Sequence, residues 1–145
     1  MARTSISLQI PADTSFVGLV RTATLGFASR LDFPIDQLDE LSHAAHEMTT
    51  LLLADTGEGG LIDLQITELN TETVQVEASS QTNRGLVPRT NSFAWTIINA
   101  LVDSVDATAI DGIVTITAVR SIQPYEPDSG APNNVAPNGR TEAAL

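Results

Sequence analysis

The chain has 145 residues, which suits one domain with its own apolar core, and its formal net charge is −11. All seven of its Lys and Arg positions are Arg; so acidic a surface disfavours nucleic-acid binding and either attracts a basic protein partner or only keeps the protein soluble. The absence of cysteine excludes disulfides, thiolate metal sites and a cysteine nucleophile. No apolar run could span a membrane and no secretory signal is recognisable, so we expect a cytoplasmic protein.

The first part of the sequence predicts one strand and two helices. Residues 5–10, SISLQI, alternate between polar and apolar, and Pro11 ends this predicted strand. A helical stripe of apolar residues follows at Phe16, Leu19, Val20, Ala23, Phe27 and Leu31. Pro34 suits the first turn of a second helix, which the glycines of DTGEGG (55–60) end. The apolar face of that helix is predicted at Ile35, Leu38, Leu41, Ala45, Met48 and Leu52.

The rest of the sequence predicts a hairpin, a third helix and a last strand. Residues 61–69 and 73–79 alternate on either side of a short polar link, as in a β-hairpin. After a loop at 80–91, Ser92 is a suitable N-cap for a helix. We expect this helix to continue to residue 105 and to bury Phe93, Ile97, Leu101 and Val105. Residues 112–119, GIVTITAV, predict the final strand.

The predicted order β-α-α-β-β-α-β favours an α+β fold. It is typical of a two-layer sandwich in which a mostly antiparallel sheet carries its helices on one face. We assign residues 1–120 to this domain. Residues 121–145 are rich in Pro, Gly, Asn and Ala and lack periodicity, and are predicted to form a disordered tail.

The stretch HAAHEMTTLL (43–52) holds both histidines of the chain beside an acid. His43 and His46 lie on one helix face at a spacing of three, but no third ligand of suitable spacing accompanies them, so no metal site is predicted. Glu47 lies at the edge of the apolar stripe, where a carboxylate either acts as a base or is simply solvated. The glycines of DTGEGG precede a strand rather than a helix, which indicates a helix end and not a phosphate loop.

The pattern FVGLVRTATLGFASRLDFPIDQLDELSHAAHEMTTLLL resembles the first two helices of the anti-sigma-factor serine kinases, which belong to the GHKL (Bergerat-fold) ATPases. The resemblance spans about residues 5–120 and places Glu47 at the family's catalytic base. Leu51 stands where the family has an Asn that holds Mg²⁺, and a hydrocarbon side chain cannot bind that ion. The segment EASSQTN (77–83), with Ser79, lacks the family's adenine-binding Asp-x-Gly turn, and PRTNSFAWTIINAL lacks its phosphate-binding glycines.

The helix NSFAWTIINALVDSV looks like a divergent actinobacterial branch of these anti-sigma factors. The resemblance implies a protein that sequesters an alternative sigma factor of the stress or sporulation type and is antagonised by a STAS-type anti-anti-sigma protein. It also implies a homodimer formed through the first strand and helix. Arg21 in LVRTATL matches a family arginine that contacts both partners.

The absence of the nucleotide contacts indicates a non-catalytic protein that needs no cofactor and negatively regulates transcription without binding nucleic acid itself. The alternative is an active serine/threonine kinase that phosphorylates the anti-anti-sigma factor with Mg-ATP, Glu47 acting as base. A third possibility is a sensor that binds ATP without transferring phosphate.

Overall fold

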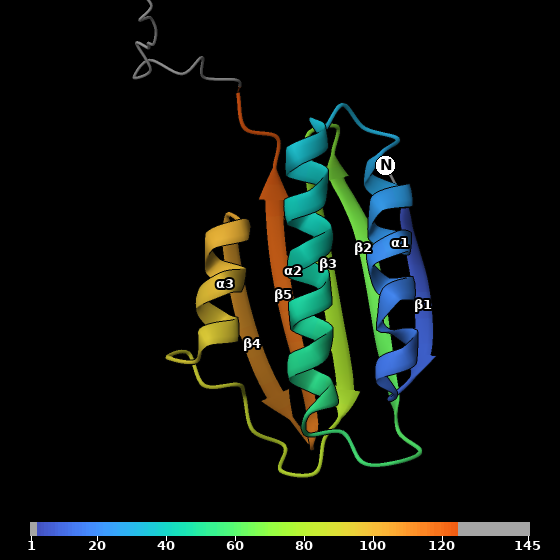
Figure 1. Cartoon of the computed structure of the whole chain (residues 1–145), viewed down its shortest axis with the longest axis vertical. Helices are drawn as coiled ribbons and strands as arrows, with labels where there is room; N and C mark the ends of the chain where they lie inside the picture. The colour runs from blue at the N-terminus through green and yellow to red at the C-terminus, as the bar shows by residue number, and fades with distance from the viewer. Residues whose placement is uncertain (1–2, 125–145) are drawn as a thin grey trace, which may run out of the picture.

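The computed structural model describes residues 3–124, which form a five-stranded antiparallel sheet and a layer of helices (Figure 1). The strands are β1 (Ser5–Pro11), β2 (Leu61–Asn70), β3 (Thr73–Gln81), β4 (Ser104–Ile110) and β5 (Ile113–Ser121). The helices are a 3-10 turn (Thr14–Phe16), α1 (Val17–Ala28), α2 (Ile35–Leu53) and α3 (Phe93–Leu101). None of the helices in residues 3–124 is long and apolar enough to cross a membrane.

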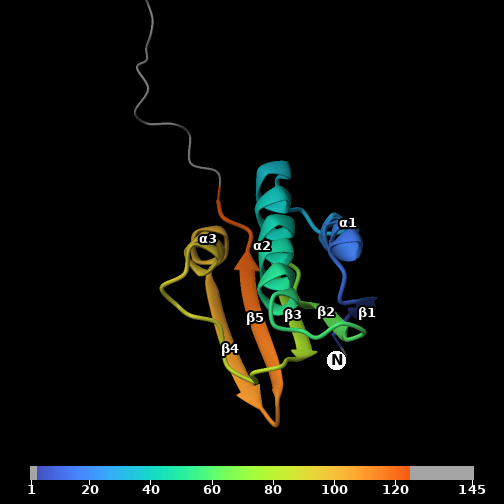
Figure 2. The ribbon, with the colours of Figure 1, turned by 60° about the horizontal axis from the view of Figure 1, so that its bottom comes forward.

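The sheet has the strand order β1-β2-β3-β5-β4, and all four pairings are antiparallel. All three α-helices cover the same face: α1 packs on β1 and β2, α2 on β3 and β5, and α3 beside β4. Figure 2 shows this single helix layer and the uncovered opposite face of the sheet. The expected α+β two-layer sandwich is therefore confirmed.

Alternation along the strands separates the two faces of the sheet, because successive side chains point to opposite sides. The covered face is aliphatic and the open face is mostly Ser, Thr and Gln with a few acids. The core between sheet and helices includes Ile62, Leu64, Ile66, Val74, Val76, Val114 and Ile116 from the strands and Leu41, Met48, Leu52 and Ile98 from the helices.

The two predicted helices of the first half are present, with corrections at their exposed positions. In α2, Leu41, Ala45, Met48 and Leu52 are buried as predicted, but Ile35 is 80% exposed because it occupies the first turn, beyond the edge of the sheet contact. In α1, Leu19 is also largely exposed, whereas Val20 and Phe27 are buried. The exposed Leu19 lies on the side of α1 that faces away from the core.

The third helix is shorter than predicted, and the residues after it form an unpredicted strand. α3 ends at Leu101, so Val105 lies in β4, where it pairs with Ala118 of β5. Within α3 the buried residues are Trp95 and Ile98, and Phe93 is 80% exposed. The prediction failed because it counted the apolar stripe from Phe93, on the side of the helix that carries the exposed Thr96, whereas Trp95 and Ile98 form the inner face.

The last strand extends slightly beyond residue 120, where the domain was predicted to end. β5 continues to Ser121, and Gln123 exchanges two hydrogen bonds with Gln37 of α2. The remainder of the predicted tail, residues 125–145, lies outside the described residues.

Candidate functional site

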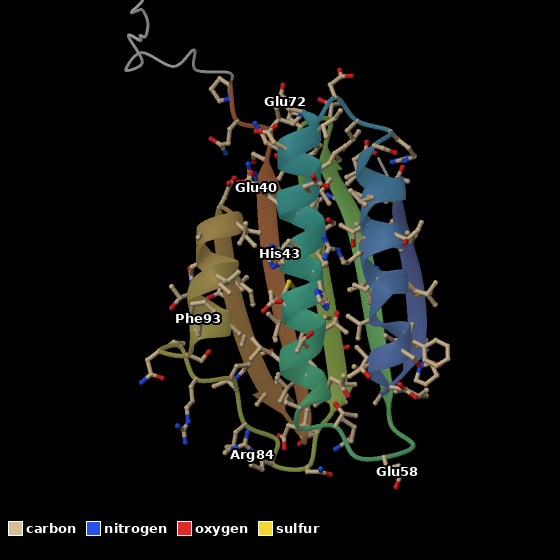
Figure 3. All side chains as sticks on the ribbon, in the orientation of Figure 1. Glu40, His43, Glu58, Glu72, Arg84 and Phe93 are labelled. Carbon is tan, nitrogen blue, oxygen red and sulfur yellow. The ribbon has the colours of Figure 1, made fainter. Side chains whose placement is uncertain are left out.

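A pocket of about 290 Å³ lies at the C-terminal end of α2, beneath the loop 82–92 that joins β3 to α3. Figure 3 shows this end of the molecule around the labelled Arg84. Residues from α2, from the loop and from β5 line the pocket: Leu51, Leu52, Ala54, Asp55, Thr82, Arg84, Leu86, Pro88, Arg89, Ser92 and Val114. Its volume is close to the lower limit for sites that take small molecules.

The loop is attached to the end of α2 by Asp55. The carboxylate of Asp55 accepts hydrogen bonds from the Arg84 backbone N–H at 3.3 Å and from Arg84 Nε at 3.2 Å. The backbone carbonyl of Asp55 accepts a third from the Asn83 N–H at 2.7 Å. Both carboxylate oxygens of the acid in the pocket are therefore already engaged by protein donors.

Hydroxyl groups and arginines provide the other polar chemistry of the pocket. Thr82 Oγ1 accepts from the Gly85 N–H at 2.9 Å, and Ser92 Oγ accepts from the Trp95 N–H at 3.2 Å as the N-cap of α3. Neither hydroxyl donates to an acceptor within residues 3–124. In the same part of the chain, exposed Arg89 forms no ion pair.

The inner wall of the pocket is hydrocarbon. Leu52 and Val114 are buried at its base, Leu51 is half-buried on its α2 side, and Leu86 is 60% exposed at its mouth. Leu51 therefore occupies the wall of the pocket, where a polar side chain would be required to bind a metal ion. The residues described contain no cluster of three His, Asp or Glu side chains suited to a metal.

The two histidines and Glu47 lie in the middle of α2 and do not line this pocket. Glu47 Oε2 lies 3.8 Å from His43 Nε2 and 3.9 Å from His46 Nδ1. Burial lowers the pKa of His46, the Glu47 carboxylate opposes this by raising it, and Arg21 and His43 lower it further. Arg21 of α1 therefore contributes to the electrostatic environment of His46 in α2.

The structure separates the two positions at which the sequence predicts lost nucleotide contacts. Leu51 lines the pocket, whereas Ser79 lies on the open face of the sheet, beside Asp63 and Gln9. The neighbouring residue Ser80 points inward and bonds Thr56 Oγ1 at 2.8 Å. Thr82, three residues after Ser79, is the residue of this segment that lines the pocket.

Sequence reasoning missed Arg84 and Arg89. Neither belongs to a periodic element, so hydrophobic spacing gives no information about where the loop places them. One signal was available: between residues 78 and 102 these two arginines are the only charged residues, in a chain with a net charge of −11.

No protein-family model matches the chain, and no curated protein matches it. Among solved structures, it is similar to the RsbU and RsbW domains of Rv1364c from Mycobacterium tuberculosis, with a TM-score of 0.67, 14% identity and coverage of 83% of this chain. It is also similar to the blue-light activated histidine kinase EL346 of Erythrobacter litoralis, with a TM-score of 0.55, 14% identity and coverage of 78%. The chain spans 33% and 42% of the lengths of those chains. The likeness shows that it has a GHKL-like fold.

Proposed function

We propose that this protein is a non-catalytic anti-sigma factor that sequesters an alternative sigma factor and is released from it by a STAS-type antagonist. The observation that carries the proposal is the wall of the pocket at the end of α2. In a fold shared with an RsbW domain, this wall presents Leu51 and an acid that is already paired. A protein of this kind would act through its surface.

The lining of the pocket supports a non-catalytic role, because its acid is already paired and Leu51 offers no oxygen to a metal ion. Phosphoryl transfer depends on a divalent cation that neutralises the charge developing on the phosphates. Loss of this cation removes the largest electrostatic stabilisation of the transition state. Asp55 is the acid that lines the pocket, and its oxygens are 3.2 and 3.3 Å from Arg84 donors. Glu47, the proposed base of the kinase alternative, lies against two imidazoles instead of in the pocket.

The outer surface of α1 supports partner binding. Arg21 is exposed and forms no ion pair within residues 3–124, and arginine is a frequent anchor of protein interfaces. Phe16 and Leu19 are also exposed on the same segment, and Ile6 is exposed on the edge strand β1. This combination of an edge strand and apolar side chains also supports the proposed homodimer.

The first test is capture of purified alternative sigma factors from the same genome by the full chain. Specific retention of one of them is expected, and Arg21→Glu should abolish it while leaving the circular-dichroism spectrum and thermal midpoint unchanged. Arg3→Glu makes the same charge change at another exposed arginine and should retain binding. A folded chain that retains none of the sigma factors would contradict the proposal, and unchanged capture by Arg21→Glu would show that the α1 surface is not the binding surface.

The kinase alternative has its own test. Calorimetric titration of the full chain with Mg-ATP is expected to give no micromolar binding, and incubation with a STAS protein and labelled ATP should give no phosphoserine. A micromolar dissociation constant together with phosphate transfer would replace the non-catalytic proposal by the kinase.

A further inference from the structure

We propose that the pocket between α2 and loop 82–92 binds a small organic anion with an apolar body, such as an aromatic carboxylate, without a metal ion. The inference concerns the pocket alone and does not depend on which protein the α1 surface binds. It follows from three properties of the lining: its charge, its hydrogen-bonding groups and its shape.

The charge of the pocket is opposite to that of the protein. Arg84 and Arg89 are the only charged residues between positions 78 and 102, although the whole chain carries a net charge of −11. Asp55 balances Arg84, which leaves the guanidinium of Arg89 as the excess charge at the mouth. A cationic group held within an acidic surface attracts a small anion only at short range, because the rest of the molecule repels it.

The hydrogen-bonding groups of the side chains in the pocket are donors. The hydroxyls of Thr82 and Ser92 use their oxygens as acceptors from backbone N–H groups, and their protons have no acceptor within residues 3–124. The Arg89 guanidinium adds five more N–H groups. The two oxygens of Asp55 already accept from Arg84. A carboxylate or sulfonate, which only accepts, matches these donors, whereas an ammonium group would be repelled by the Arg89 guanidinium.

The shape of the pocket sets the size and orientation of the ligand. Its 290 Å³ is about twice the volume of the engineered cavity that binds benzene, so a two-ring body fits it. Leu51, Leu52 and Val114 form the apolar base, and the arginines lie at the exposed rim, Arg84 with a side chain that is 67% exposed. The apolar body therefore enters first and the anionic group remains at the mouth, beside the arginines.

The test is calorimetric titration of the full chain with 2-naphthoate, compared with 2-naphthamide, which has the same rings and no charge. A ligand of this size is expected to bind with a dissociation constant of about 1 mM or tighter. Replacing the carboxylate by the amide should weaken binding about tenfold, because charge-assisted hydrogen bonds are lost. Arg89→Gln should weaken 2-naphthoate binding by a similar factor and leave 2-naphthamide binding unchanged. Arg3→Gln, a matched substitution outside the pocket, should change neither.

Three outcomes would overturn the proposal. The first is absence of 2-naphthoate binding by the folded chain at millimolar concentration. The second is equal binding of the acid and the amide, or equal binding by Arg89→Gln and the unaltered chain. The third is binding of Mg-ATP that is tighter than that of 2-naphthoate and is lost with EDTA, because it would identify a metal-dependent nucleotide site. Arg89 is exposed, so its substitution is not expected to unfold the protein, and a thermal scan checks this.

Discussion

The arginines at the two ends of the helix layer differ in burial and in the number of their partners. At the end that holds the first turns of α2, Arg120 is 7% exposed and donates to the Glu40 carboxylate at 3.0 Å and to the carbonyls of Leu101 and Ser121. At the other end Arg84 has a side chain that is 67% exposed and one partner, Asp55, and Arg89 has no ion pair within residues 3–124. Figure 3 shows the separation through the labelled Glu40 and Arg84. The first end uses its polar groups to hold the fold together, and the second leaves them available to a ligand.

Arg120 also explains how the end of α3 is stabilised. The last carbonyls of a helix lack intrahelical donors, and here the guanidinium of Arg120 supplies one to Leu101. Asp103, just after the helix, accepts from the Ser121 N–H at 2.9 Å and from Gln123 Nε2 at 3.2 Å. These contacts join α2, α3 and the end of β5 in one polar network.

The largest expected effect comes from breaking this network at its centre. Arg120→Ala should lower the free energy of unfolding by about 2–3 kcal/mol, because it removes a buried side chain and leaves the Leu101 carbonyl without its donor. Urea unfolding followed by circular dichroism measures the change. Arg89→Ala, at the other end, should change stability by less than about 0.5 kcal/mol. Similar losses in the two variants would mean that the ends do not differ as described.

A smaller effect is expected from the contact between α2 and the last described residues. Gln37→Ala removes both hydrogen bonds to the Gln123 backbone, of 3.1 and 2.8 Å, and should cost about 1–2 kcal/mol because the contact is largely buried. Hydrogen exchange should quicken more at the Gln123 N–H, which loses its own acceptor, than at the Val76 N–H at the centre of the sheet. If exchange at Gln123 were unaltered, the attachment would not depend on Gln37.

Disrupting the ion pair at the pocket end should have less effect still. Arg84→Gln removes the contact between Nε and Asp55 but keeps the backbone hydrogen bond, so we expect a loss of at most about 0.5 kcal/mol from an exposed pair. The same urea titration measures it, with 1 M salt added in a second series. A loss of 2 kcal/mol would show that the loop is part of the stabilising framework, which would contradict the contrast between the two ends.

The sequence predicted most accurately those elements whose apolar residues fit only one periodicity and one buried face. The α2 stripe Leu41, Ala45, Met48 and Leu52 is buried as predicted, and both strands of the 61–81 hairpin pair as predicted. The β4–β5 hairpin was missed although Asp111-Gly112 is a strong signal for a two-residue turn. Both residues have positive φ, 53° and 82°, as such a turn requires. The predicted helix extended to residue 105 and so included the first two residues of β4, Ser104 and Val105.

The candidate site was less predictable than the fold. Leu51 could be placed because it lies on a periodic helix, and Ser79 could not be placed reliably because one residue of register changes the face of a strand. Arg84 and Arg89 lie in a loop whose path depends on the contacts of Asp55, and these contacts join residues 29 positions apart. No local pattern records such a contact.

The smallest expected effect is a pH dependence from the middle of α2, between the two ends. Burial, with Arg21 and His43 adding to it, lowers the pKa of His46 in the folded protein below its ordinary value of about 6.5, although Glu47 acts in the other direction. The unfolded chain therefore binds this proton more readily. As the pH falls through 6.5 toward the folded pKa, the stability should decrease, and above 6.5 the contribution of this group should be constant.

His46→Gln removes the group that titrates, so its free energy of unfolding should fall less steeply between pH 7 and pH 5 than that of the unaltered chain. Arg21→Gln should have an intermediate slope, because loss of the cation raises the pKa of His46 while burial still lowers it. Urea unfolding at pH 5, 6, 7 and 8 gives the three slopes. Equal slopes for His46→Gln and the unaltered chain would exclude His46 as the source. If Arg21→Gln has the same slope as the unaltered chain, Arg21 does not contribute to the lowered pKa of His46 and burial is its main cause. The Arg21 guanidinium would then lie, in solution, too far from the imidazole to influence it.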